Sequence, residues 1–154
     1  MKALLACAVC LAGFPLAVVA QDDLPIDQSK LYVSDPAACE ALEKKGVDAF
    51  MDTDFLVLSF KDGIHSMEFT CDLYEIKSRP NNNMLFVDAI CQAPGEVYPD
   101  TFSISPYDAK TIQLVSTYDA MMAMSRPVDG AEPTGNPGVT LYTRCDNLSE
   151  IRVD

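Results

Sequence analysis

The sequence predicts a small antiparallel β-barrel of six strands with one N-terminal helix, between the all-β and α+β classes. Short segments in which apolar and polar residues alternate recur from residue 55 to residue 145, as is typical of strands with one buried face. Turn-forming Gly, Pro, Asn and Asp residues separate these segments. An open, cystatin-like sheet wrapped around the helix is the alternative. Closure into a barrel removes exposed strand edges, so the barrel is favoured.

The first twenty residues have the features of a secretory signal peptide. Lys2 provides a positive start, the run Ala3 to Ala20 is apolar, and Val18-Val19-Ala20 resembles a cleavage site. A membrane anchor is the alternative, but this run of about 18 residues only just reaches spanning length. We expect residues 21–34 to form a flexible segment, in which Leu31-Tyr32-Val33 could add a short edge strand. Residues 35–154 are expected to form a single disulfide-bonded β domain, with no membrane attachment after cleavage. The expected location is the periplasm or the extracellular space.

The chain is strongly acidic, with a formal net charge of −12 at pH 7. Cleavage after Ala20 would remove one lysine and no acid, which leaves a charge of −13. Such a surface argues against nucleic-acid binding, because phosphate groups are neutralised by Lys and Arg. Cationic proteins, cationic ligands and divalent metals are the partners that the charge permits, although a high charge also keeps an exported protein soluble.

A helix is expected between Asp35-Pro36, which supply a cap and a proline at the first helical position, and a stop at Gly46. Residues 21–154 contain four cysteines, and an even number in an exported chain predicts two disulfides. The strand register favours two pairs, Cys71–Cys91 and Cys39–Cys145. The alternative is Cys39–Cys91 with Cys71–Cys145, because a bridge between directly opposed strand residues is strained.

Three central strands are predicted at Phe55–Phe60, His65–Lys77 and Met84–Ala93. A two-residue turn at Asp62-Gly63 would place Leu58 opposite Met67 and Leu56 opposite Phe69. In the next hairpin, matching of the apolar faces places Cys71 opposite Cys91 and Leu73 opposite Ala89. The expected inward layer therefore comprises Leu56, Leu58, Met67, Phe69, Leu85 and Val87.

The second half of the chain predicts three further strands. Pro94–Asp100 reads as a turn-rich connection, after which strands at Thr101–Ser105 and Thr111–Thr117 would set Ile104 against Ile112. Tyr118–Gly138 reads as a long irregular loop, and loops of that length are commonly functional or disordered. The last predicted strand is Val139–Cys145.

No catalytic constellation is evident. His65 is the sole histidine of the sequence, no G-x-S-x-G segment accompanies it, and a structural role beside the turn is the expectation. Calcium at Asp48, Asp52 and Asp54 is disfavoured because no EF-hand loop pattern is present. A copper site is conceivable from thioether and imidazole ligands, drawn from His65, Met67, Met121, Met122 and Met124, although such methionines more often fill apolar gaps.

The segment Cys-Gln-Ala-Pro-Gly-Glu-Val-Tyr-Pro-Asp at 91–100 and the earlier Phe69-Thr70-Cys71 resemble small exported bacterial proteins of uncharacterised function. The resemblance covers most of residues 21–154 and implies an envelope or periplasmic location, with no catalytic motif. By architecture and size the chain is also similar to periplasmic inhibitors of lysozyme, which are small disulfide-bonded β proteins that bind a basic enzyme. It lacks their Ser-Gly-rich inhibitory loop, so charge and compartment alone support that interpretation.

These observations predict a non-enzymatic exported binding or interaction protein for a cationic protein partner, with no cofactor. The expected contact surface is the long loop, with Tyr118, Met121, Met122, Met124 and Arg126. A carrier of a small ligand or of copper is one alternative. An inhibitor of a basic envelope enzyme such as lysozyme is another.

Overall fold

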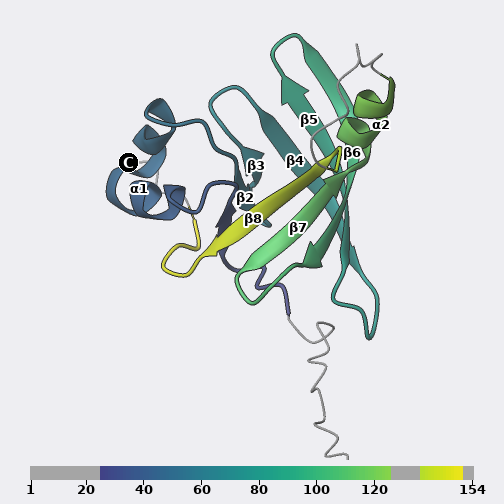
Figure 1. Ribbon diagram of the computed structural model, residues 1–154, viewed down its shortest axis with the longest axis horizontal. Helices are drawn as coiled ribbons and strands as arrows, with labels where there is room; N and C mark the ends of the chain where they lie inside the picture. Colours follow the sequence, from purple (N-terminus) through teal and green to yellow (C-terminus); the bar gives the residue numbers. More distant parts are fainter. Residues whose placement is uncertain (1–24, 126–135, 151–154) are drawn as a thin grey trace, which may run out of the picture.

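In the computed structural model, which describes residues 25–125 and 136–150, eight antiparallel strands close into a barrel (Figure 1). The strands are β1 (Leu31–Val33), β2 (Val57–Ser59), β3 (Gly63–His65), β4 (Thr70–Ser78), β5 (Leu85–Ala93), β6 (Glu96–Pro106), β7 (Thr111–Ser116) and β8 (Val139–Cys145). Each strand pairs with the next, and β1 also pairs with β8. The predicted barrel is confirmed and the open sheet is excluded, but the strand number exceeds the predicted six.

Strand β1 closes the barrel, whereas the sequence predicts a flexible segment with at most a short edge strand at these residues. Its three residues are at most 2% exposed, and they pair with β2 on one side and β8 on the other. Tyr32 packs in the barrel interior, whereas Leu31 and Val33 pack on the outer side of the strand. Apolar side chains on both faces explain why this short segment is held so firmly.

Two hydrophobic clusters lie on opposite faces of the barrel wall. The first fills the interior with side chains from all eight strands, among them Tyr32, Leu58, Ile64, Cys71, Val87, Ile104, Leu114 and Tyr142. The second lies outside the barrel, where α1 (Ala38–Lys45) and the 3-10 helix η2 (Gly46–Met51) cover β1 and β2. In Figure 1 these helices project to one side of the barrel.

Helix α1 ends at Gly46 as its sequence predicts, but it begins at Ala38, two residues after the predicted start at Pro36, and a turn at Asp35 leads into it. The Asp35 carboxylate accepts a hydrogen bond from the Ala37 backbone N–H at 3.0 Å, and the Asp35 carbonyl accepts one from Ala38. At the other end Gly46 has φ +56° and donates its N–H to the Leu42 carbonyl, a conformation that favours glycine. The helix therefore presents Ala38 and Leu42 to the outer cluster.

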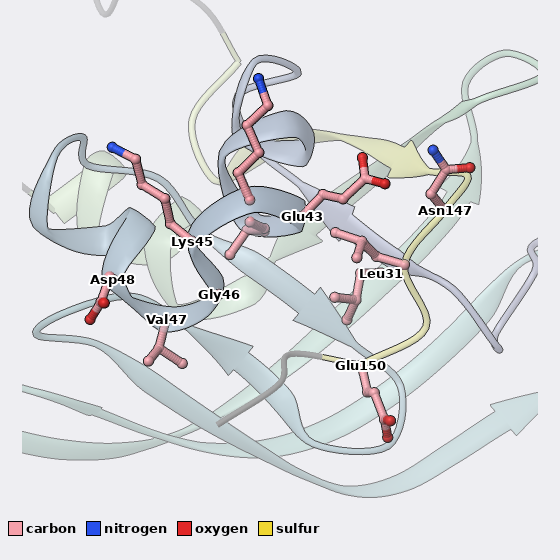
Figure 2. Close-up of a pocket in the computed structure, with 11 residues that line it drawn as sticks. Leu31, Glu43, Lys45, Gly46, Val47, Asp48, Asn147 and Glu150 are labelled. Carbon is pink, nitrogen blue, oxygen red and sulfur yellow. The ribbon is translucent and has the colours of Figure 1, made fainter. Parts of the chain in front are cut away.

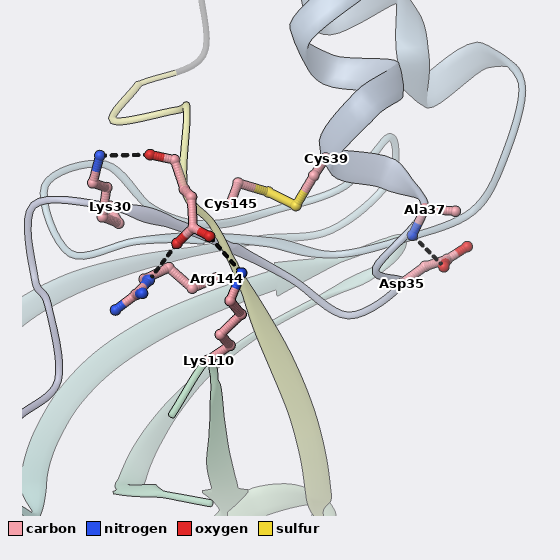
Figure 3. Close-up of a disulfide and its surroundings, with 8 residues drawn as sticks. Lys30, Asp35, Ala37, Cys39, Lys110, Arg144 and Cys145 are labelled. Carbon is pink, nitrogen blue, oxygen red and sulfur yellow. Dashed lines mark hydrogen bonds and ion pairs between the residues drawn. A yellow bond between two sulfur atoms is a disulfide. The ribbon is translucent and has the colours of Figure 1, made fainter. Parts of the chain in front are cut away.

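Each disulfide belongs to one of these clusters. Cys39–Cys145 joins α1 to the end of β8 in the outer cluster (Figure 3), and Cys71–Cys91 joins directly opposed residues of β4 and β5 in the interior. The structure thus has the pairing that the strand register favours and not the alternative Cys39–Cys91 with Cys71–Cys145.

The predicted turn at Asp62-Gly63 is wrong. Gly63 belongs to β3, and Leu58 pairs with Ile64 instead of Met67. The turn lies earlier because the Ser59 hydroxyl accepts the backbone N–H groups of Lys61 and Asp62, each at 3.2 Å. A side-chain hydroxyl that bonds the backbone two and three residues later stabilises such a turn.

The predicted long strand His65–Lys77 is interrupted by a turn, in which the Ser66 N–H donates to the Phe69 carbonyl at 2.8 Å. Met67 sits in this turn and is 59% exposed, so its predicted place in the inward layer is wrong. The other members of that layer are retained: Leu58, Leu85 and Val87 are buried, and Leu56 and Phe69 pack partly against the interior.

Strands β4, β5 and β6 form the longest part of the wall. Cys71 pairs with Cys91 and Leu73 with Ala89, as predicted, until a bulge between Leu73 and Glu75 shifts the register by one residue. The segment predicted to connect strands, Pro94–Asp100, is instead mostly β6. A tight turn at Pro94-Gly95 joins β5 to β6, so that Ala93 pairs with Glu96.

The β6–β7 register differs from the prediction by two residues, because Ile104 pairs with Leu114 and not with Ile112. The Asp108 carboxylate accepts the N–H groups of Lys110 and Thr111, both at 2.8 Å, which makes the loop shorter than expected. A shift of two leaves every side chain on its predicted face.

After β7 the chain forms the helix α2 (Thr117–Ser125) where the sequence predicts an irregular loop. Residues 126–135 of that predicted loop, Arg126 included, lie outside the described residues, as does the predicted signal peptide.

Candidate functional site

The N-terminus of α2 is anchored to the barrel by Asp100, which lies on β6 and is 8% exposed. Its carboxylate accepts hydrogen bonds from the Ser116 hydroxyl at 2.5 Å and from the backbone N–H groups of Thr101 at 2.7 Å and Tyr118 at 2.9 Å. The Ser116 oxygen in turn accepts the Asp119 N–H at 3.0 Å. Two side chains thus satisfy N–H groups of the first helical turn that have no partner within the helix.

Two stacked tyrosines lie beside this anchor. The rings of Tyr98 on β6 and Tyr118 on α2 are nearly parallel, at 16°, with centroids 3.7 Å apart. The Tyr118 hydroxyl donates to the Glu96 carboxylate at 3.2 Å. Because Glu96, Tyr98 and Asp100 alternate along β6, one strand supplies two carboxylates and an aromatic ring to the same end of the barrel.

The local electrostatics are dominated by negative charge. Burial raises the pKa of Tyr98 to about 12, and the carboxylates of Asp119, Asp100 and Glu96 add to this effect. Partial burial, together with the charge of Asp100, also raises the pKa of Asp119. In the part of the chain that the structure describes, no lysine or arginine pairs with Glu96, Asp100 or Asp119. This end of the barrel therefore presents carboxylates that an external cation can neutralise.

Apolar surface adjoins the carboxylates. No residue of α2 is buried, and Met121 and Met124 are 51% and 77% exposed. A shallow groove of about 210 Å³ runs between α2 and β6, lined by Pro99, Asp100, Thr101, Thr117, Tyr118 and Met121. Of the predicted contact residues, the structure places Tyr118, Met121, Met122 and Met124 together on this helix instead of on a loop.

We call this region the α2 surface: Glu96, Tyr98, Asp100, Tyr118, Asp119, Met121 and Met124. Carboxylates attract ammonium and guanidinium groups, tyrosine faces bind cations, and exposed thioether side chains adapt to varied apolar stems. The arrangement suits the side chains of lysine and arginine, whose charged heads sit on long apolar stems.

The residues that the sequence suggests as metal ligands come from different elements of the structure. Among the described residues no group of three or more His, Cys, Asp and Glu side chains is placed to hold a metal ion, and Asp52 is paired with Lys45. The ring Nε2 of His65 lies 2.6 Å from the Asp62 carbonyl oxygen, beside the turn. The methionines of α2 belong to a helix whose main contacts are with β6 and β7.

A second cleft, of about 520 Å³, lies between the α1–η2 segment and the chain after β8 (Figure 2). Glu43, Lys45, Asp48 and Glu150 are among the residues that line it, so both signs of charge are present. Its lysines already have partners, since Lys44 pairs with Glu40 and Lys45 with Asp52. With these lysines neutralised, Glu43, Asp48 and Glu150 leave the cleft with a negative lining, but the described residues that line it include no exposed aromatic ring or methionine beside the acids.

The cations near the Cys39–Cys145 disulfide are also paired (Figure 3). The Asp146 carboxylate accepts hydrogen bonds from Lys110 at 2.6 Å and from Arg144 at 2.9 Å. The Asp146 backbone carbonyl accepts one from Lys30 at 2.7 Å. These contacts lower the pKa of Asp146, chiefly through the hydrogen bonds from Lys110 and Arg144. The cluster ties the chain after β8 to the barrel and leaves the disulfide flanked by neutralised charge.

Sequence reasoning missed the residues that build the α2 surface from the barrel side, namely Glu96, Tyr98, Asp100 and Ser116. One local signal was available: Ser116-Thr117-Tyr118-Asp119 fits the capping pattern of Ser or Thr followed three residues later by an acid. The contribution of Asp100 comes from a different strand and has no local signature.

Comparisons with protein-family models, with curated proteins and with solved structures found no match. In the described parts of the chain, neither helix has the length and apolar character needed to cross a membrane. The two disulfides indicate an oxidising environment of the extracellular type.

Proposed function

We propose that this protein is a non-enzymatic, exported binding protein that captures a cationic protein partner on its α2 surface. The observation that carries the proposal is that the carboxylates of Glu96 and Asp119 lie beside exposed Met121 and Met124, and that no lysine or arginine of the described residues forms an ion pair with them. Lysine or arginine side chains of a partner would neutralise the acids and cover the thioethers. The net charge of −12 would draw such a partner toward the protein.

The rigid mounting of the surface supports the same proposal. Asp100 and Ser116 hold the first turn of α2, and the Tyr98–Tyr118 stack holds its side against β6. A surface that is already ordered loses little conformational entropy when it binds. The exposed methionines remain free to adapt.

A basic envelope enzyme such as lysozyme belongs to the partner class that this chemistry selects, so inhibition of such an enzyme is one form of the proposed function. The disulfides, which indicate an oxidising compartment, fit a periplasmic or secreted protein. The alternative of a carrier that holds its ligand inside the barrel has less support. The interior of a small eight-stranded barrel is just wide enough for side chains, and here it is packed with large ones such as Tyr32, Ile104 and Tyr142.

The test is calorimetric titration of the purified protein with an oligolysine peptide and with lysozyme, at about 0.1 M and about 1 M salt, where the Debye length falls from about 10 Å to about 3 Å. Binding is expected at low salt and is expected to weaken strongly at high salt. Replacing Glu96→Gln together with Asp119→Asn should weaken binding roughly tenfold, which corresponds to about 1.4 kcal/mol.

The matched control is Glu40→Gln together with Glu43→Gln on α1, which removes the same charge far from the α2 surface. This control should retain most of the affinity. Equal losses in the two double variants would mean that only net charge matters, and absence of binding at low salt would contradict the proposal. An assay of lysozyme activity in the same samples decides whether capture also inhibits.

A further inference from the structure

A pocket of about 660 Å³ lies between the β4–β5 loop and the β6–β7 loop. The β5–β6 register brings these loops together, because Leu85 pairs with Ile104 and the chain continues from there into both loops. Asn81, Asn82 and Asn83 line one side, and Ser105 and Tyr107 line the other. Tyr107 follows Tyr98 by nine positions along β6 and its end, roughly 30 Å at 3.3 Å per residue, so this pocket is separate from the α2 surface.

The chemistry of the lining is unusual for so acidic a chain. None of the residues that line the pocket is charged, whereas the whole chain carries a net charge of −12. Three consecutive asparagines supply amide groups, each with two donors and an acceptor, and Ser105 adds a hydroxyl. Paired donors and acceptors of this kind match the hydroxyl groups of a neutral, polyhydroxylated ligand.

Tyr107 adds an aromatic face. Its side chain is 50% exposed, so a ring of the ligand can lie against it while hydroxyl groups reach the amides. A pyranose has one face of C–H bonds and a rim of hydroxyls, and it therefore presents both kinds of surface at once. A flat apolar face with a few placed polar groups is the usual composition of a small-molecule site.

The two loops are held in place by their own hydrogen bonds. The Asn82 side-chain oxygen accepts the Met84 N–H at 2.8 Å, and the Asn82 N–H donates to the Arg79 carbonyl at 3.2 Å. On the other side the Tyr107 N–H donates to the Thr111 carbonyl at 2.9 Å. The pocket is therefore formed before a ligand arrives, which limits the entropic cost of binding.

From these observations we infer that the pocket between the β4–β5 and β6–β7 loops binds a neutral saccharide, with Tyr107 as the stacking platform and the asparagines as hydrogen-bonding groups. The site is independent of the proposed capture of a cationic protein. It would give the exported protein a second attachment, to a glycan.

The experiment is a titration of the full chain, labelled with nitrogen-15, with chitotetraose, cellotetraose and maltotetraose as neutral probes, followed by amide NMR shifts. At least one probe should give saturable shifts at residues 81–84 and 105–107, with a dissociation constant of roughly 0.1–1 mM. Tyr107→Ala should weaken this binding roughly tenfold or more, and Tyr107→Phe, which keeps the ring, should retain most of it. Tyr74→Ala, at a tyrosine that is 70% exposed on β4, is the control and should bind as the unaltered protein does.

Three results would overturn the inference. One is the absence of saturable shifts at both loops with all three neutral probes. Another is equal weakening by Tyr107→Ala and Tyr74→Ala. The third is a preference of the pocket for the deacetylated, cationic form of chitotetraose, because the same backbone with added charge would then be the better ligand.

Discussion

Replacement of Asp100 by alanine should detach α2 from the barrel at a measurable cost in stability. Three hydrogen bonds end on this carboxylate, from Ser116, Thr101 and Tyr118. Bonds to a charged group contribute roughly 1.5–3 kcal/mol each, but water can reach the freed donors at this rim. We therefore expect Asp100→Ala to lower the free energy of unfolding by about 3 kcal/mol.

Asp100→Asn should cost less, about 1 kcal/mol, because the amide oxygen can still accept the two backbone N–H groups while the bond from the Ser116 hydroxyl is lost. Urea unfolding followed by circular dichroism measures both values. The control is Asp88→Ala on the neighbouring strand, where an exposed carboxylate pairs with Lys77 at 2.8 Å and a smaller effect is expected. If Asp100→Ala destabilises the protein no more than Asp88→Ala, the assignment of Asp100 as the anchor of α2 is wrong.

Three other predictions follow from the same structure. Gly63→Ala should destabilise the fold far more than Gly95→Ala. Both glycines have positive φ, but only an alanine at Gly63 would place its Cβ against a backbone atom, 2.1 Å from the Cys71 carbonyl oxygen. Urea unfolding should show a loss of about 1–2 kcal/mol for Gly95→Ala and a larger loss for Gly63→Ala. The pKa of Tyr98 is raised to about 12 in the folded state, whereas the pKa of a tyrosine in the unfolded chain is about 10. The folded state therefore holds the proton more tightly, and the free energy of unfolding should fall as the pH rises from about 10 to about 12. Tyr98→Phe should make this fall less steep. Removal of the α1–β8 disulfide should lower the free energy of unfolding by about 5 kcal/mol, because its cysteines are 106 residues apart. The β4–β5 disulfide spans 20 residues, and its removal should cost about 3 kcal/mol. The reverse order of the two losses in chemical denaturation would contradict the loop-closure argument.

The side-chain periodicity of the sequence predicts faces better than it predicts strand pairs. Ile104 and Leu114 point inward as their alternation indicates, although their pairing differs by two residues from the prediction. In the β2–β3 hairpin the predicted register differs by three residues, and an odd shift changes the face. Ile64 consequently takes the buried place opposite Leu58, while Met67 is exposed in the turn that follows β3. The error arose because the Ser59 hydroxyl fixes the turn, and a propensity rule for Asp-Gly does not include that bond.

Strand β1 and helix α2 show where local patterns become uninformative. Leu31, Tyr32 and Val33 are apolar on both faces, so a segment of three residues carries no alternation, and only its pairing with β2 and β8 defines it. Helix α2 buries none of its residues and therefore lacks a distinct apolar stripe. Its start depends on Asp100, sixteen residues before Ser116, and that contact exists only in the folded barrel.

The candidate site was predictable in part. The group Tyr118, Met121 and Met124 is recognisable as unusual from the sequence alone, and the structure places these residues on one exposed helix. Two of the carboxylates that give the surface its charge, Glu96 and Asp100, come from a separate strand, β6. Their convergence requires the β6–β7 register, which the sequence does not determine.

The most direct test of a cation-binding α2 surface is to map where an oligolysine peptide binds, by amide NMR shifts of the labelled protein at low salt. The account predicts saturable shifts that are largest at Glu96, Tyr98, Tyr118 and Met121. Shifts spread evenly over the acidic residues of α1 and the barrel loops, or no saturable shifts at all, would contradict it.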